Sequence, residues 1–192
     1  MPRLLLLNGP PGIGKSTLAR RYVADHPLAF CLDIDVLRRL LGRWDEHPQA
    51  SGLLARKMAV EMARVHLLSG YDVVMPQFLG RVEFIEQPEA VANEANACFY
   101  EVALMDTKPN ALARFDARRE DAGLAVHHRD AQRMSGGAAG LSEMYDRLQA
   151  VLANRPLALR GSHALRCRRP GVPTPACGDW RTLRLIGSTM SA

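Results

Sequence analysis

The chain has 192 residues and a formal net charge of +5, which is the size of one ordinary α/β domain that buries its core without disulfides or metals. It contains no apolar run of about 18 residues and no signal-peptide pattern, so we expect a cytoplasmic protein with no membrane contact. Its four cysteines form no C-x-x-C pair, and we expect neither disulfides nor zinc.

The basic residues are concentrated at one end of the chain. Of the 25 basic and 20 acidic residues, seven arginines and one aspartate lie in residues 155–192, which leaves a net charge of −1 on residues 1–154. A protein that binds nucleic acid through phosphate contacts should carry its positive charge on the folded domain. The overall charge therefore does not favour a nucleic-acid partner.

The first predicted elements surround a glycine-rich motif. Residues 4–7 are a short apolar run before a turn, which predicts a buried strand, and residues 15–26 predict a helix that ends at Pro27. Between them, residues Gly9 to Ser16 read GPPGIGKS and match the Walker A pattern G-x-x-x-x-G-K-[ST]. A strand, this loop and a helix in that order predict a phosphate-binding P-loop.

The chemistry of a P-loop assigns roles to its residues. Backbone N–H groups of the loop and the amino end of the helix point at the phosphates of ATP, Lys15 reaches the β- and γ-phosphates, and the Ser16 hydroxyl binds Mg²⁺. The predicted nucleotide-binding residues in this segment are Gly9, Pro10, Pro11, Gly12, Ile13, Gly14, Lys15, Ser16 and Thr17.

A second strand, predicted over residues 28–32, leads into Asp33-Ile34-Asp35 and a helical turn over residues 38–41. Because ligands bind at the carboxyl ends of parallel strands, these acids should lie near the P-loop. Asp35 is the candidate general base for a hydroxyl acceptor, although it is equally a residue type that caps helices. Arg38 is a candidate for binding the acceptor or stabilising transition-state charge, or else a surface arginine.

The middle of the chain continues the alternation of helices and strands. After a loop containing Gly42 and Pro48, apolar spacing predicts a helix over residues 54–68. The remaining elements are a strand at 71–75 stopped by Pro76, a helix at 82–96 interrupted at Pro88, and a strand at 98–105. The apolar strand ending at Met75 is followed by Pro76 and Gln77 rather than an acid, so Mg²⁺ would depend on Ser16, phosphates, water and Asp33.

The third part of the chain predicts a lid and a tail. Residues 110–121 form an arginine-rich helix, residues 122–140 a glycine-containing connection, and residues 141–152 another amphipathic helix. The domain boundary is placed at 154, because residues 155–192 are rich in Arg, Pro and Gly and show no lasting apolar period. This tail has no predicted packing role; it is either a disordered extension or the product of an altered reading frame.

The P-loop followed by a strand and D-x-D-x-x-R resembles the P-loop kinase group of AAA-type ATP-binding proteins. This group includes chloramphenicol phosphotransferase and gluconate kinase-like, polynucleotide kinase-like and zeta-toxin-like enzymes. The resemblance covers residues 1–154 and implies a three-layer P-loop NTPase fold, with a parallel sheet, helices on both faces and a helical lid at about 110–140. It also implies catalytic roles for Asp35, Lys15 and Arg38.

In that group, lid arginines clamp the phosphates, and this chain has Arg114, Arg118 and Arg119 at matching positions. Their spacing places them on or near one helix face, where they bind phosphate or pair with neighbouring acids in solvent. Arg118 is the catalytic candidate among them.

Three functions follow from these features. The leading one is an ATP- and Mg²⁺-dependent kinase that phosphorylates a hydroxyl of a small molecule. The alternatives are a polynucleotide 5′-hydroxyl kinase and an ATP-binding protein without catalytic activity. The acceptor and the oligomeric state cannot be read from the residues.

Overall fold

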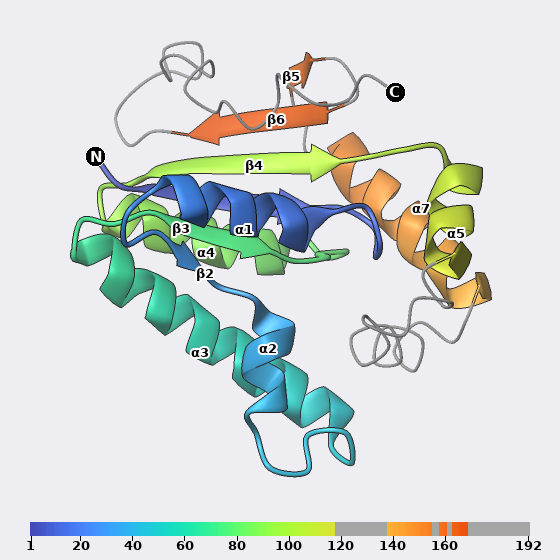
Figure 1. Ribbon diagram of the computed structural model, residues 1–192, viewed down its shortest axis with the longest axis horizontal. Coiled ribbons are helices and arrows are strands. Elements are labelled where there is room, and N and C mark those ends of the chain that lie inside the picture. The colour runs from blue at the N-terminus through green and yellow to red at the C-terminus, as the bar shows by residue number, and fades with distance from the viewer. Residues whose placement is uncertain (118–137, 155–157, 161–162, 169–192) are drawn as a thin grey trace.

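The sheet of the protein is built around its first strand. The computed structural model describes residues 1–117, 138–154, 158–160 and 163–168, and within them six strands lie in the order β2-β3-β1-β4-β6-β5 (Figure 1). These strands are β1 (Arg3–Asn8), β2 (Phe30–Cys31), β3 (Val73–Pro76), β4 (Cys98–Leu104), β5 (Ala158–Arg160) and β6 (His163–Arg168). The first four strands are parallel to one another, which confirms the predicted parallel sheet.

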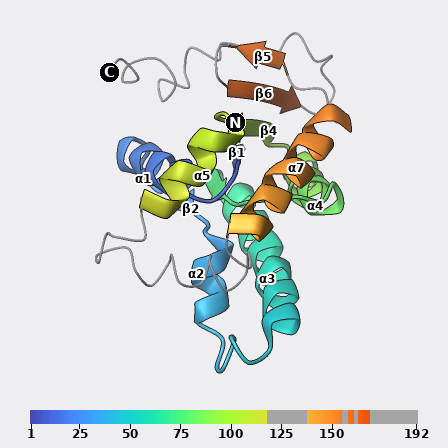
Figure 2. The same cartoon turned by 90° about the vertical axis from the view of Figure 1, so that its right-hand side faces the viewer.

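Helices cover both faces of this sheet, as predicted for strands that alternate with helices. The described helices are α1 (Lys15–Asp25), α2 (Ile34–Arg39), α3 (Pro48–Leu68), α4 (Glu83–Glu94), α5 (Lys108–Ala117) and α7 (Ala138–Asn154). Figure 2 shows α1 on one face of the sheet and α4 on the other. Among the described residues, no helix combines the length and the apolar character needed to cross a bilayer.

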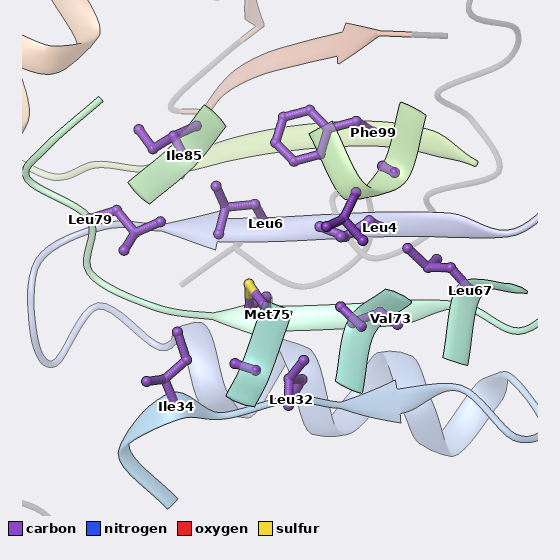
Figure 3. Packing of buried hydrophobic residues seen from close by; sticks show 14 of the residues in the cluster. Leu4, Leu6, Leu32, Ile34, Leu67, Val73, Met75, Leu79, Ile85 and Phe99 are labelled. Carbon is purple, nitrogen blue, oxygen red and sulfur yellow. The ribbon is translucent and has the colours of Figure 1, made fainter. Parts of the chain in front are cut away.

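Two apolar clusters hold the layers together. Leu4 and Leu6 of β1 belong to a cluster on the α3 and α4 face, whereas Leu5 and Leu7 pack with Tyr22 of α1 on the opposite face. This alternation is the period of two expected for a strand buried on both sides. Figure 3 shows the first cluster, with the labelled side chains Leu4, Leu6, Leu32, Ile34, Leu67, Val73, Met75, Leu79, Ile85 and Phe99. Burial of each large side chain contributes about 1.5–3 kcal/mol.

The boundaries of two elements differ from the predictions for local reasons. β2 is shorter than residues 28–32 because Leu28 has a φ of 61°, which an extended strand does not allow. α3 starts earlier than predicted, with Pro48 at its first turn instead of in a loop. Proline suits that position because its missing N–H would have no helical partner there.

Two other prolines are accommodated within elements. Pro76 is the last residue of β3 and pairs in register with Leu7, while the next N–H, that of Gln77, donates to the Leu7 carbonyl oxygen at 3.0 Å. Pro88 lies inside α4, so the predicted interruption is wrong and the helix is continuous. Packing of Ile85 and its neighbours on the sheet outweighs the lost backbone hydrogen bond.

The chain beyond Asn154 contributes to the sheet, contrary to the expectation that it has no packing role. β6 pairs antiparallel with β4 over its whole length, from Phe99 opposite Arg168 to Leu104 opposite His163, and β5 pairs with β6. Residues 155–157, 161–162 and 169–192 lie outside the described part of the chain, so the predicted domain boundary at 154 stays a prediction.

Candidate active site

The P-loop connects the end of β1 to α1, as predicted. Gly12 and Gly14 have φ values of 85° and 104°, in the left-handed region that favours glycine. Gly9 is required for a different reason, because a Cβ at that position would lie only 2.6 Å from the Leu104 carbonyl oxygen of the neighbouring strand. The loop therefore turns tightly and passes directly against β4.

The Lys15 side chain lies across the loop that precedes it. Its Nζ donates hydrogen bonds to the carbonyl oxygens of Gly9 at 2.8 Å and Pro10 at 3.0 Å. Gly14 is the N-cap of α1, and no side chain caps the first turn of this helix. The uncapped N–H groups and the lysine charge are the two features that favour an anion here. Ser16 lies in the first turn of α1, partly buried, and Thr17 beside it is exposed.

Asn8 is a site residue that the sequence did not reveal. It is fully buried, and its Oδ1 accepts hydrogen bonds from the N–H groups of Gly9 and Leu79, both at 2.9 Å. Its Nδ2 donates to the Leu79 carbonyl oxygen at 3.1 Å. One amide side chain thus fastens the start of the P-loop to the segment that follows β3.

Asp33 and Asp35 follow β2 and lie at different positions at the start of α2. Asp33 is the N-cap of α2, with its Oδ1 accepting from the N–H groups of Asp35 at 3.0 Å and Val36 at 3.4 Å. The suggested capping role thus belongs to Asp33, and Asp35 lies in the first turn of α2 instead. The two carboxylates do not lie on one face of a strand, because the chain is already helical at Ile34.

Asp35 is an exposed residue, although neighbouring protein atoms reduce the hydration of its carboxyl. Loss of hydration is the main cause that raises the pKa of Asp35 above its usual range, and the charge of Asp33 raises it further. The charges of Arg39, Lys15 and Arg38 oppose this rise. The effect of the Lys15 charge shows that Asp35 lies within electrostatic reach of the P-loop lysine.

Arg38 is buried, with 4% of its surface exposed. Its Nε donates to the Ser51 hydroxyl at 2.9 Å and its Nη2 donates to the Pro48 carbonyl oxygen at 2.8 Å. Its guanidinium also lies over the Trp44 ring, 5.0 Å from the centroid. Arg38 therefore holds α2 against the start of α3. The alternative that Arg38 is a surface arginine is wrong, because its side chain is buried.

A second arginine of interest is Arg56 of α3. It was not singled out in the sequence. Its guanidinium stacks over Phe84 of α4, 4.5 Å from the ring centroid. Burial lowers the pKa of Arg56, while the charge of Asp35 raises it and those of Arg38 and Arg81 lower it. In the sequence it appears only as one polar position of an amphipathic helix.

Magnesium ligands are sparse around this loop. In the described residues no group of three or more His, Cys, Asp or Glu side chains could hold a metal ion. Ser16 and Asp33 offer oxygen donors of the type that Mg²⁺ prefers, and Mg²⁺ commonly takes only one or two protein ligands together with phosphates and water. The donor set therefore fits a metal that arrives with a nucleotide. Gln77, at the end of β3, is buried with an Oε1 that accepts no hydrogen bond from any described residue.

The predicted lid is only partly visible. α5 contains Arg114, whose side chain is outside the described part of the structure, as are Arg118 and Arg119 altogether. The helices on either side of this segment are joined, since Lys108 pairs with Asp146 at 2.7 Å. The phosphate contacts expected of the three arginines remain predictions.

Comparison with known proteins agrees with this architecture. A family model described as an AAA domain (AAA_33) matches residues 4–140. A chain in the structure of the Pnkp1/Rnl/Hen1 RNA repair complex superposes with a TM-score of 0.60 at 18% identity, covering 80% of this chain and 46% of that chain. A candidate kinase from Chloroflexus aurantiacus J-10-fl gives a TM-score of 0.51 at 21% identity, covering 64% and 69%.

These similarities differ in what they establish. At such low identities the two solved structures show a shared fold, and this chain spans less than half the length of the first. No curated protein matches the sequence significantly. The family model, however, covers most of the chain, and it includes the P-loop, Asp33 and Asp35. This chain therefore belongs to that AAA domain family and is a P-loop, kinase-like α/β protein.

Proposed function

We propose that this protein is an ATP-dependent kinase that transfers the γ-phosphate of ATP to a hydroxyl of a small molecule. One arrangement carries the proposal: Asp35 lies in the first turn of α2, just after β2, where its charge interacts with that of Lys15 in the P-loop. A P-loop alone supports nucleotide binding, whereas a nearby base supports transfer to a hydroxyl.

In this mechanism the nucleotide binds across the P-loop. The N–H groups at the start of α1 and the Lys15 ammonium bind the β- and γ-phosphates, and Lys15 exchanges its present contacts with Gly9 and Pro10 for phosphate oxygens. Ser16 and Asp33 would hold Mg²⁺, which when bound neutralises charge on the phosphates. Asp33 would use Oδ2, because its Oδ1 caps α2.

Asp35 orients the acceptor hydroxyl and accepts its proton as the hydroxyl oxygen bonds to the γ-phosphorus of ATP, while the bond from that phosphorus to the β–γ bridging oxygen breaks and ADP leaves. A base works best when its pKa approaches the working pH, and the raised pKa of Asp35 moves it in that direction. Arg38 fixes α2, and with it Asp35, through its contacts with Ser51, Pro48 and Trp44. Arg114, Arg118 and Arg119 would complete the site by binding phosphate oxygens and excluding water, with Arg118 acting in catalysis.

The test is phosphoryl transfer to a pool of hydroxylated acceptors. The protein is incubated with ATP, Mg²⁺ and sugars, polyols, nucleosides, aminoglycosides and 5′-hydroxyl oligonucleotides, and products are identified by mass spectrometry. A phosphorylated small molecule is expected. ATP binding without any product would favour the non-catalytic alternative, and phosphorylated oligonucleotides alone would favour the polynucleotide kinase.

A matched pair of variants connects the activity to the site. Asp35→Asn should lower transfer by about 100-fold or more while ATP still binds, the scale expected on losing a general base. Asp25→Asn removes an exposed carboxylate at the far end of α1 and should leave transfer unchanged. Full activity of Asp35→Asn would remove Asp35 from the mechanism.

A further inference from the structure

Arg56 has hydrogen-bonding capacity that the described protein does not use. Its Nη1 donates to the Gly52 carbonyl oxygen at 3.2 Å, and its buried Nε has no acceptor among the described residues. A buried donor without a partner is costly, and charged donors more so, which makes such groups uncommon in folded proteins. The arrangement is therefore typical of a donor whose hydrogen-bond acceptor is supplied by a bound ligand.

The side chain is nevertheless held in a defined position. The Phe84 ring supports one face of the guanidinium, with Cζ 4.5 Å from the ring centroid. Gly52 lies one helical turn earlier, and a Cβ there would come within 3.4 Å of Nη1. A stacked and partly fixed guanidinium loses little freedom when it binds, which is the feature that favours arginine in oxyanion sites.

The surrounding charges are mainly positive. Arg81 lies over the same Phe84 ring at 6.0 Å, and the charges of Arg38 and Arg81 both act against the charge on Arg56. Asp35 is the acid whose charge favours it. The Arg56 guanidinium is thus repelled by two positive charges and attracted by one negative charge, and an arriving anion would relieve this repulsion.

Arg56 differs from Arg38 in this respect. Arg38 is 4% exposed, and its Nε and Nη2 are hydrogen bonded to Ser51 and Pro48. Arg56 is only partly buried and has a single hydrogen bond within the described protein. Of these two arginines, whose charges both interact with that of Asp35, Arg56 is the one suited to bind a ligand.

We infer that Arg56 is the anchor for an anionic group of the acceptor, so that the substrates are small hydroxylated molecules carrying a carboxylate, sulfate or phosphate. This inference rests on the proposed kinase function. The acceptor binds by its oxyanion to the Arg56 guanidinium against Phe84, and its hydroxyl lies at Asp35, between that anchor and Lys15. Neutral sugars and polyols lack the group that Arg56 binds.

The first experiment compares acceptors in matched pairs. Gluconate is paired with glucitol, and glucose 6-phosphate with glucose, in the transfer assay with mass spectrometry. Products are expected only from anionic members of such pairs. For the acceptor found, Arg56→Gln should raise KM by about 10- to 100-fold, the loss expected for a charge-assisted hydrogen bond, with the KM for ATP unchanged.

The control is Lys57→Gln, which removes the same charge from the adjacent, exposed position of α3. It should retain the KM of the wild-type protein for the acceptor. A neutral molecule as the preferred acceptor, an oligonucleotide as the only acceptor, or an unchanged KM in Arg56→Gln would each overturn the inference.

A second measurement does not depend on catalysis. The P-loop is saturated with Mg²⁺ and a non-hydrolysable ATP analogue, and the rise in Tm on adding sodium sulfate is compared with that in sodium chloride of equal ionic strength. We expect sulfate to raise Tm by about 3 °C more in the wild-type and Lys57→Gln proteins than in Arg56→Gln. General salt effects act on all three proteins equally.

The two measurements separate the two proposals. If no acceptor is phosphorylated but the sulfate effect depends on Arg56, the anion site is retained and the kinase function is not. If transfer occurs to neutral acceptors only and sulfate stabilises all three proteins equally, the kinase function is retained and the anion anchor is wrong.

Discussion

Asn8 joins the P-loop to the segment that follows β3, and replacing Asn8 with alanine tests how much this junction contributes to stability. Asn8→Ala removes three hydrogen bonds in a fully buried environment, two accepted from the N–H groups of Gly9 and Leu79 and one donated to the Leu79 carbonyl oxygen. Each buried group left without a partner costs about 1–3 kcal/mol. Water entering the vacated space would replace some of the lost hydrogen bonds. We therefore expect a loss of about 3–5 kcal/mol in the free energy of unfolding.

This loss is large compared with the usual domain stability of about 5–15 kcal/mol, and for a domain of this size it corresponds to a decrease in Tm of roughly 10 °C. Urea denaturation measures the change in free energy, and calorimetry of ATP binding measures whether the loosened loop also binds nucleotide less tightly. The control is Asn93→Ala, at an exposed position of α4, which should change stability by less than about 0.5 kcal/mol. A similarly small change for Asn8→Ala would refute the assigned role of these hydrogen bonds.

Three further substitutions address the site. Lys15→Ala should abolish tight ATP binding in calorimetry, because it removes the charge that pairs with the phosphates, and unchanged affinity would contradict the P-loop assignment. Gly9→Ala places a Cβ 2.6 Å from the Leu104 carbonyl oxygen, so the loop must shift; we expect a stability loss of about 1–3 kcal/mol by denaturation, together with weaker ATP binding. Asp35→Asn should remove the acidic limb of the pH–rate profile, which in the wild-type enzyme reflects protonation of the base as pH falls through the raised pKa of Asp35.

The raised pKa of Asp35 also predicts an effect on stability. Asp35→Asn should lower the activity but raise the free energy of unfolding at neutral pH. The folded state holds the Asp35 proton more tightly than the unfolded state does, so ionisation of Asp35 at neutral pH destabilises the fold. Asp35→Asn should therefore stabilise the protein at pH 7. The gain should shrink as pH falls through the pKa of the folded state and vanish below that of the unfolded state, about 3.9. Urea denaturation of both proteins at pH 7 and at low pH measures the change in unfolding free energy caused by Asp35→Asn. An equal change at the two pH values would contradict ionisation of Asp35 as its cause.

Local signals explain which parts of the fold could be predicted. The P-loop was predicted correctly because its glycines, lysine and flanking strand and helix lie within one short segment. The start of α2 was harder to place, since Asp33 and Asp35 are both plausible caps and only the backbone turn at Asp33 decides between them. The shortening of β2 depends on the positive φ of Leu28, which nothing in a leucine side chain indicates.

The parts that were missed depend on residues distant in the sequence. Asn8 meets Leu79 across 71 positions, and Arg56 meets Phe84 across two helices. The pairing of β6 with β4 is likewise non-local, and the composition of the tail gave no periodic pattern from which to infer it. When each residue of such a contact looks ordinary within its own segment, the order of residue types along the chain does not reveal the contact.

The strand β6 has a consequence for solubility. Without it, the outer side of β4 would present unpaired peptide groups along Phe99–Leu104, and all residues of β4 are buried in the present structure. An exposed, apolar sheet edge is a template for pairing with another chain and thus for aggregation. The strand β6, which belongs to a segment that looks dispensable by composition, thus covers this edge, and a chain cut after Asn154 should self-associate when expressed.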